Sequence, residues 1–357
     1  MRQLQVRGGR KLPAEGLERV LIRGTNWIGD VVMTLPAVAA VRKTWPRARI
    51  SILAKPWVAE VYRLSPDVDE IIPFEEPGRH AGIPGKWRLA ADLRRCRFDC
   101  AILLQNAIEA AILARLANIP LRAGYNSDAR GLLLTHSVRR IPEIRRVHQI
   151  DYYLAMVGAL GCRSADRGVR LVPGADYVGI AQGLFSECGI DESRPLIGIA
   201  PGAAYGPAKK WFPERFAAVA DRLIDETGSQ AVLFGSAGDR ESTAAVAQSA
   251  RHSLVDIAGK TNLREAMAVI ARCNLFLSND SGLMHVAGAL GIPTIAVFGS
   301  TNPAATSPVG EKSVVIHHVV ECGPCLKPVC PTDFRCMESI GAEEVYAAAK
   351  RLLGEAS

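Results

Sequence analysis

Residues whose types and spacing could do chemistry gather in three short segments of the chain. The segments are "RGTNWIGDVVMTLP" (23–36), "PGAAYGPAKKWFPERF" (201–216) and "SNDSGLMHVAGALG" (278–291). Each begins at the end of an apolar run typical of a buried strand and leads into a helical pattern. In parallel α/β sheets, ligands bind where strands end and helices begin. The three segments are therefore the candidate parts of a ligand site.

The first segment presents one carboxylate, Asp30. Its "GTNWIG" has the glycine spacing of a phosphate-binding P-loop, but Asp30 and Val31 stand where a P-loop has Lys and Ser or Thr. This argues against a nucleotide at this loop. With a usual carboxyl pKa of about 3.9, Asp30 would be ionised at neutral pH and able to take a proton from an acceptor hydroxyl. The alternative is that Asp30 caps the following helix, and the residues alone leave both interpretations open.

The second segment presents a lysine pair. Gly202 and Gly206 predict a loop, and Lys209 and Lys210 come just before a helix that Pro213 opens. Lysine charge beside the free N–H groups of a helix start suits a diphosphate. The alternative is a pair of solvated surface lysines.

The third segment joins a predicted turn to a helix start. Asn279 and Asp280 form the turn, and the residues after them offer their backbone amides to whatever occupies the strand end. The candidate ligand-binding residues here are Ser278, Asp280, Ser281, Gly282, Leu283 and His285. The alternative is that Asp280 caps the helix and that His285 packs against the sheet.

Val- and Ile-rich runs alternate with amphipathic segments along the chain. Runs such as "RVLIRG" (19–24) and "LIGIAPG" (196–202) predict buried strands, and stretches such as "PERFAAVADRLIDETG" (213–228) predict helices. This alternation is typical of a parallel sheet that helices cover on both faces.

The alternation runs once before residue 160 and begins again near residue 195. We therefore expect an α/β protein with two doubly wound, Rossmann-like domains, residues 1–175 and 176–340. Residues 341–357 should form a C-terminal helix that packs back on the N-terminal domain.

Composition narrows the class of protein and of partner. With 48% hydrophobic and 22% charged residues, the chain reads as globular, and neither a membrane-spanning run nor a signal peptide is visible, so we expect a cytoplasmic protein. Residues 1–160 carry 25 Lys and Arg against 15 Asp and Glu, a formal charge of +10. This basic half suggests an anionic partner, such as nucleic acid, phospholipid headgroups or a phosphorylated or acidic-sugar substrate.

Together the three segments resemble the ADP-heptose:lipopolysaccharide heptosyltransferase family. "RGTNWIGDVVMTLPAVAAVRKTWP" resembles its N-terminal signature, "PGAAYGPAKKW" its phosphate loop and "SNDSGLMHVAGALGIPTIAVFGSTNP" its donor-site signature. Within the family, "GPAKKW" and "CGPCLKPVCPTDFRCMESI" look most like the heptosyltransferase II group, which adds the second heptose of the inner core. The resemblance implies a GT-B-type fold, in which two Rossmann-like domains face each other across a cleft.

The resemblance also implies a reaction and a role for each candidate residue. The enzyme would be an inverting glycosyltransferase that moves L-glycero-D-manno-heptose from ADP-heptose to heptosyl-Kdo2-lipid A in lipopolysaccharide core biosynthesis. Asp30 would be the base, while Lys209 and the amides of residues 281–283 would stabilise the departing ADP without a divalent metal or other cofactor. Asp280 and His285 would bind sugar hydroxyls or phosphate. Candidates for the remaining donor contacts are Ser278, Gly202, and either Asp239 or Glu241 at the ribose.

The acceptor implied by the resemblance is an anionic glycolipid at the inner face of the cytoplasmic membrane, so membrane contact would be peripheral and nucleic acid would not be a partner. Candidates to meet its carboxylates and phosphates are Arg122, Arg130, Arg139, Arg140, Arg145, Arg146 and His148. An ordinary charged surface is the alternative for each of them.

Four of the nine cysteines form a compact C-x2-C-x4-C-x5-C cluster. Its members are Cys322, Cys325, Cys330 and Cys336. Four thiolates would suffice for a structural Zn²⁺; free thiols or a disulfide are the alternatives.

Three other classes of protein stay open at this level. A nicotinamide oxidoreductase shares the doubly wound architecture, but its glycine fingerprint is missing here. A sugar-nucleotide epimerase of the same two-domain form would act without an acceptor, and a non-catalytic glycolipid-binding protein would leave the donor intact. A heptosyltransferase for the first or third heptose is the alternative within the family.

Overall fold

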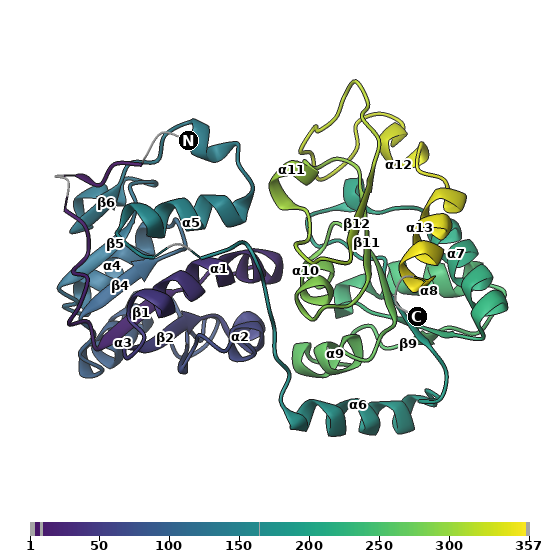
Figure 1. The fold of residues 1–357 in the computed structure, drawn as a ribbon, viewed down its shortest axis with the longest axis horizontal. Coiled ribbons are helices and arrows are strands. Elements are labelled where there is room, and N and C mark those ends of the chain that lie inside the picture. The colour runs from purple at the N-terminus through teal and green to yellow at the C-terminus, as the bar shows by residue number, and fades with distance from the viewer. Residues whose placement is uncertain (1–3, 8–9, 164, 355–357) are drawn as a thin grey trace. The chain divides into compact units, whose positions relative to one another are not determined.

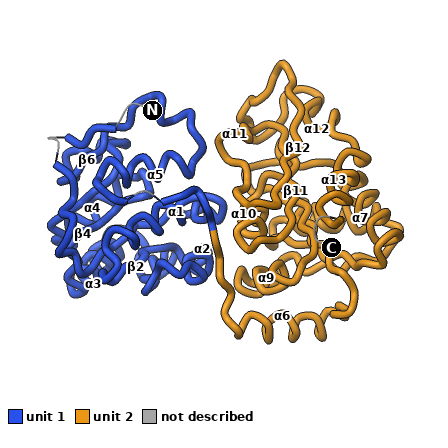
Figure 2. The backbone as a smooth tube through the Cα atoms, in the orientation of Figure 1, with its two compact units in different colours: residues 1–169 blue, residues 170–357 orange. Residues whose placement is uncertain are grey.

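The computed structural model describes residues 4–7, 10–163 and 165–354, which belong to two compact units, 1–169 and 170–357 (Figure 2). Each unit is built on one sheet of six strands, which confirms the predicted pair of doubly wound domains. The boundary falls after Val169, earlier than the expected position after residue 175. Leu171 N already donates to Ala289 O of the second unit (3.0 Å), so the connecting segment belongs with that unit.

The sheet of the first unit has the strand order β3-β2-β1-β4-β5-β6, and all of its neighbouring strands are parallel (Figure 1). The strands are β1 (Arg19–Arg23), β2 (Arg49–Ala54), β3 (Glu70–Pro73), β4 (Cys100–Leu103), β5 (Leu121–Tyr125) and β6 (His136–Val138). The helical elements described are α1 (Ile28–Thr44), α2 (Pro56–Arg63), α3 (Gly82–Arg95), α4 (Ile108–Leu116), η2 (Arg130–Leu132), η3 (Glu143–Arg145) and α5 (Gln149–Ala159).

Helices cover both faces of this first sheet. On one face α1 packs against α2 and α5, and its long apolar run from Val31 to Val41 is almost entirely buried there. On the other face α3 and α4 bury Leu89, Leu93 and Leu113 against the strand residues that point toward them. The strand order places the topological switch point between β1 and β4, where such sheets bind ligands.

The sheet of the second unit repeats this topology with the order β12-β11-β10-β7-β8-β9, again all parallel. Its strands are β7 (Leu196–Ala200), β8 (Gln230–Leu233), β9 (Val255–Asp256), β10 (Leu275–Asn279), β11 (Thr294–Phe298) and β12 (Ser313–His317). The helical elements described are α6 (Ala175–Cys188), η4 (Pro207–Lys209), α7 (Pro213–Thr227), η5 (Ala237–Asp239), α8 (Arg240–Ser249), α9 (Leu263–Ile270), α10 (Gly282–Ala289), α11 (Pro303–Thr306), α12 (Arg335–Glu338) and α13 (Ala342–Gly354).

The last helix, α13, lies beside α7 and against the second sheet, where Val345, Ala349 and Leu352 join the core (Figure 1). Part of its apolar stripe is therefore buried within the second unit, and its packing on the N-terminal domain stays a prediction. Within the described residues, no helix is both long enough and apolar enough to span a membrane.

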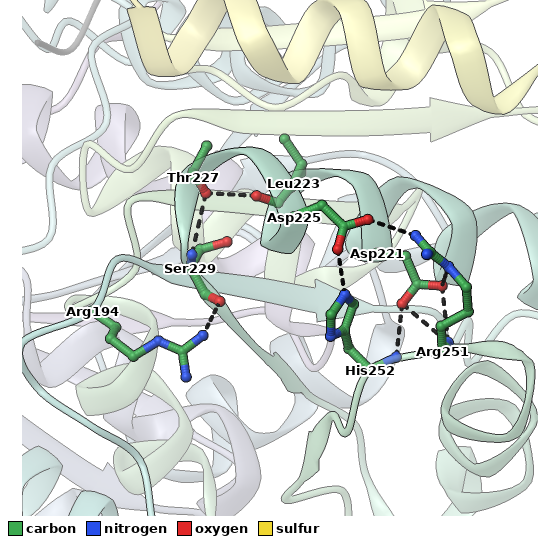
Figure 3. Close-up of polar contacts among 8 residues, drawn as sticks. All are labelled: Arg194, Asp221, Leu223, Asp225, Thr227, Ser229, Arg251 and His252. Atoms are coloured by element: carbon green, nitrogen blue, oxygen red, sulfur yellow. Dashed lines mark hydrogen bonds and ion pairs between the residues drawn. The ribbon is translucent and has the colours of Figure 1, made fainter.

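A polar clamp fixes α7 to the segment that follows α8, away from the strand ends that carry the candidate site (Figure 3). The buried carboxylate of Asp221 accepts the backbone N–H groups of Arg251 and His252 at 2.9 to 3.1 Å. One helical turn further along α7, the Asp225 carboxylate contacts the side chains of Arg251 and His252, at 2.7 Å each. The buried carboxylate takes over two backbone donors that would otherwise lack a partner.

Candidate functional site

The carboxyl ends of β7 and β10 meet at the switch point of the second sheet. These strands are neighbours, and the loops that follow them are two of the three segments singled out by sequence. Asn279, the last residue of β10, joins them: its Oδ1 accepts from Trp211 N (2.9 Å) and its Nδ2 donates to Pro201 O (2.7 Å). This buried amide fixes both ends of the lysine loop, a role that sequence reasoning missed.

A buried ion pair forms the centre of this site. Lys209 Nζ lies 2.6 Å from Asp280 Oδ2, and Thr301 Oγ1 donates to the same oxygen at 2.6 Å. Asp280 is only 5% exposed, so its charge is held by these partners rather than by water. Thr301 was not among the predicted residues, although its position in "FGSTNP", just after the buried strand β11, is the kind of signal that could have found it.

The two lysines of the pair have different surroundings. Lys210 Nζ donates to Ser242 Oγ (2.8 Å) on α8, whereas Lys209 turns toward the strand end and also lies over the ring of Tyr205, 5.1 Å from its centroid. The two lysines therefore differ in place: Lys209 lies at the carboxyl end of β10, and Lys210 lies against α8.

The first turn of α10 lies directly after Asp280. Ser281 is the N-cap residue and makes no side-chain cap; its hydroxyl lies 2.9 Å from that of Ser278 instead. Residues 281–283 are partly exposed, so the backbone donors at this helix start are accessible to an anion. His285, one turn further on, is buried.

Asp239 and Glu241, the two candidates for contact with the ribose, differ in their surroundings. Asp239 Oδ2 accepts from the backbone N–H (2.9 Å) and hydroxyl (2.7 Å) of Ser236, so this oxygen closes a capping box at η5. A Cβ at Gly202 would stand 2.1 Å from the other oxygen, Oδ1, which explains the glycine at that position. Glu241 is exposed in the first turn of α8. These contacts give Asp239 a structural role and leave Glu241 the more available of the two.

In the first unit, Asp30 lies in the first turn of α1, after β1 and beside the switch point of that sheet. Trp27 occupies the N-cap position of α1 without a side-chain cap, so Asp30 is not the N-cap residue. Asp30 is partly exposed. The pKa of the buried phenol of Tyr153 is raised well above its usual value by burial and, secondarily, by the Asp30 charge.

A buried guanidinium holds the loop that precedes Asp30. Arg23, at the end of β1, donates from Nη1 to Gly24 O (2.6 Å) and Leu53 O (3.2 Å) and from Nη2 to Asn26 Oδ1 (3.1 Å). Burial lowers the pKa of Arg23 to about 10, which leaves it protonated at neutral pH. Sequence reasoning missed Arg23 because an arginine at the end of an apolar run gives no sign of being buried.

Two of the predicted acceptor-binding arginines are structural. Arg130 is fully buried and donates to the carbonyls of Leu103, Gln105 and Tyr125. Arg122 likewise donates to carbonyls in its own unit, at residues 119, 120 and 133. The carbonyls that Arg130 contacts lie at or just after the ends of β4 and β5, and those that Arg122 contacts lie just before β5 and just after η2. Arg130 is buried, whereas Arg122 is partly exposed.

The other predicted acceptor residues lie nearer the surface. Arg139 is exposed and lines a pocket of about 410 Å³ with Arg7, Asn126 and Leu132. Arg145 and Arg146 are exposed in and after η3. Arg140 lies over the ring of Tyr152 (5.5 Å), and His148 is a buried N-cap residue of α5 whose Nδ1 accepts from Ile150 N (3.2 Å).

The cysteine cluster does not form a metal site among the described residues, where no group of three or more His, Cys, Asp or Glu side chains is arranged to hold an ion. All four thiols, at 322, 325, 330 and 336, are free. Burial raises the pKa of Cys330, but hydrogen bonds from Thr332 and Phe334 outweigh this effect and lower the pKa overall. The zinc interpretation therefore gains no support.

The segment between these cysteines braces the lysine loop. Pro328 O accepts from Ala208 N (2.9 Å), and Leu326 O accepts from the hydroxyl of Tyr205 (2.5 Å). A side chain at Gly206 would collide with Pro328 O. The cluster thus belongs to a loop that supports Lys209.

Comparisons with known proteins agree with this geometry. The sequence profile of glycosyltransferase family 9 (heptosyltransferase) matches residues 86–334. Lipopolysaccharide heptosyltransferase 2 of Salmonella typhimurium is 33% identical over 306 residues, which cover 84% of this chain and 87% of that protein. The protein of the same name from Escherichia coli is 32% identical with the same coverage.

Two solved structures share the fold over nearly the whole chain. The Escherichia coli ADP-heptose lipopolysaccharide heptosyltransferase II superimposes with a TM-score of 0.80 at 29% identity, covering 95% of this chain and 99% of that one. A family 9 glycosyl transferase from Veillonella parvula gives a TM-score of 0.86 at 28% identity, covering 96% and 100%.

Proposed function

Because the chain belongs to glycosyltransferase family 9, the heptosyltransferases, we propose that it transfers L-glycero-D-manno-heptose from ADP-heptose to heptosyl-Kdo2-lipid A in lipopolysaccharide core biosynthesis. The observation that carries the proposal is the pairing of Lys209 with Asp280 beside the start of α10, at the switch point of the second sheet. The names of the relatives at 32 to 33% identity support the second heptose as the one added.

The second unit would hold the donor. An ADP diphosphate placed at the carboxyl ends of β7 and β10 would meet one full positive charge from Lys209 and the free N–H groups of residues 281–283. Lys209 has three N–H donors, and Asp280 uses one of them. The other two remain for phosphate oxygens, and Asp280 serves to aim the ammonium group.

Asp280 would also orient the sugar. Its Oδ2 is occupied by Lys209 and Thr301, and Oδ1 is the oxygen proposed to accept a hydrogen bond from a heptose hydroxyl. Ser278 would support the helix start through Ser281, and His285 would support it from its buried side. The ribose is assigned to Glu241 rather than to Asp239, whose Oδ2 is committed to its capping box.

The first unit would hold the acceptor and the base. Asp30 would take the proton of the acceptor hydroxyl as its oxygen attacks the anomeric carbon of the heptose. The bond from that carbon to the β-phosphate oxygen breaks in the same displacement, so the configuration inverts and ADP leaves with the electron pair. Such a base contributes about 10² to 10⁴-fold. Lys209 and the α10 amides would stabilise the charge that grows on ADP.

The acceptor is proposed to be an anionic glycolipid. Arg139, Arg145 and Arg146 are exposed on the basic first unit, and they are the candidates to meet its carboxylates and phosphates. The enzyme would then work in the cytoplasm, in peripheral contact with the inner face of the membrane.

A test of the reaction class needs only the purified protein and ADP-heptose. Release of ADP should require the glycolipid acceptor and should match the heptose gained by that acceptor one for one, as measured by mass spectrometry. Conversion of the sugar nucleotide with no acceptor present would point to an epimerase instead. Binding of the acceptor with ADP-heptose left intact would point to a non-catalytic protein.

A further inference from the structure

Large exposed apolar side chains gather at one edge of the first unit's sheet. The large apolar residues exposed in the described part of residues 1–169 are Trp27, Trp57, Ile83, Trp87, Ile108, Ile112 and Leu132. They follow β1, β2, β3, β4 and β5 in turn, either in the loop after the strand or in the first turns of the next helical element. Because the strands are parallel, these positions share the carboxyl edge of the sheet.

Side-chain contacts connect this apolar edge across β1 and β2. Trp57 Nε1 donates to Asn26 O (2.9 Å), which places the indole beside the residue preceding Trp27. Lys55 Nζ lies 5.8 Å from the Trp57 ring centroid and 3.7 Å from that of Phe74, which follows β3. Trp57 therefore lies against the loop that carries Trp27, and Lys55 links it to Phe74 after β3.

The same edge continues across α3 and α4. Lys86 Nζ lies 4.2 Å from the Phe74 ring centroid and pairs with Glu109 in the first turn of α4. Ile83 and Trp87 are one turn apart on α3, as are Ile108 and Ile112 on α4, so each helix presents an apolar pair beside this ion pair. Ile83 is 75% exposed and Trp87 is 55% exposed. Covering these two side chains with an apolar surface would therefore release free energy.

Exposed arginines also follow the strands or lie on the helices at this edge of the sheet. Arg88 is exposed beside Trp87, Arg139 is exposed after β6, and Arg145 and Arg146 are exposed in and after η3. The first 160 residues carry a formal charge of +10. Tryptophan with aliphatic side chains and arginine is the composition of surfaces that sit at the boundary between headgroups and acyl chains.

We propose that the carboxyl edge of the first unit is a membrane-docking face, on which Trp27, Trp57, Ile83, Trp87, Ile108, Ile112 and Leu132 enter the surface of an anionic bilayer and the neighbouring arginines meet its headgroups. The acyl chains of a glycolipid acceptor are anchored in such a bilayer. Docking this edge on the membrane would bring the start of α1, with Asp30, to the sugar part of the acceptor without extracting the lipid. The inference rests on the proposed function only for the claim that the acceptor is a glycolipid.

Vesicle binding tests the docking face with neither donor nor acceptor present, so its failure is separate from failure of the proposed function. The full chain should co-sediment with vesicles of phosphatidylethanolamine and phosphatidylglycerol, and only weakly with phosphatidylcholine vesicles or at high salt. Tryptophan emission should shift to shorter wavelength on binding. Trp45 and Trp211 are already buried, so the shift would come from the exposed indoles of Trp27, Trp57 and Trp87 as they leave water.

The double variant Ile83→Ser/Trp87→Ser should lower the vesicle partition coefficient by roughly tenfold or more, because burial of a single large apolar side chain is worth about that factor. The matched control is Val172→Ser/Val178→Ser, which removes two exposed apolar side chains from the second unit and should bind as the wild type does. Transfer to a water-soluble, deacylated acceptor should be retained by both variants, which shows that they fold. The proposal is overturned if the wild type does not bind anionic vesicles, if the α3 variant binds as well as the wild type, or if both variants lose binding equally.

Discussion

Lys209 Nζ lies 2.6 Å from Asp280 Oδ2, while the next residue, Lys210, points to Ser242 instead. Lys209→Ala should weaken ADP binding by about tenfold to a hundredfold, since a hydrogen bond to a charged group contributes about 1.5–3 kcal/mol. It should lower kcat as well, because charge on the leaving ADP would lose its partner. Calorimetric titration with ADP and steady-state kinetics check both effects.

Lys210→Ala is the matched control for this change. It removes the same charge one residue away, where the ammonium group contacts only a serine hydroxyl among the contacts described. ADP affinity should stay within a few-fold of the wild type. Equal losses in the two variants would show that the loop acts through general charge rather than through Lys209.

Asp30→Asn should lower kcat by about 10² to 10⁴-fold and leave the affinity for ADP-heptose nearly unchanged. The amide keeps the shape of the side chain at the first turn of α1 but cannot take a proton. Asp176→Asn, at the corresponding turn of α6 in the second unit, serves as the control and should retain activity. A parallel collapse of donor affinity in the Asp30 variant would rule out its role as the base.

The acid sensitivity of the first unit should depend on Glu76. Hydrogen bonds from Lys55 and Lys86 hold the pKa of this carboxyl below its usual value. A carboxyl whose pKa is depressed in the folded state adds stability above its unfolded pKa of about 4.3, and that stability is lost as pH falls through the lower folded value. Urea unfolding at neutral pH and near pH 4 should therefore show a smaller acid-induced drop for Glu76→Gln than for the wild type. Glu143→Gln, on the surface at η3, should show the full drop.

The clamp on α7 gives a prediction about folding rather than about activity. Asp221→Ala should lower the free energy of unfolding by about 1–3 kcal/mol, because two backbone N–H groups lose their buried acceptor (Figure 3). Asp225→Ala removes an exposed carboxylate from the same cluster, where water and salt screen the charge, and should therefore cost less than Asp221→Ala. Denaturant unfolding compares the two, and a larger loss at Asp225 would contradict this account of the clamp.

Much of the fold could be predicted because buried parallel strands have a strong local pattern. Runs such as 196–202 are apolar without interruption, and the polar residues that follow them mark the carboxyl edges where Lys209 and Asp280 lie. The helix 342–354 was predicted correctly as a helix, but its apolar stripe shows only that it packs and not against which elements, so its contacts with α7 and the second sheet could not be predicted.

The parts of the site that could not be predicted depend on contacts between segments far apart in the chain. Asn279 bridges Pro201 and Trp211, and Thr301 reaches Asp280, through side chains whose types are common in any loop. Arg130 looked like a surface cation because arginine usually is one. The carbonyls that bury it come from other segments, and no local pattern reports them.

The most direct test of the proposed function is incubation of the purified protein with ADP-heptose and two acceptors that differ by one heptose, read by mass spectrometry. We predict that the acceptor already carrying one heptose gains a single heptosyl group and that the acceptor without heptose is unchanged. Transfer to the heptose-free acceptor alone, or to neither, would contradict the account.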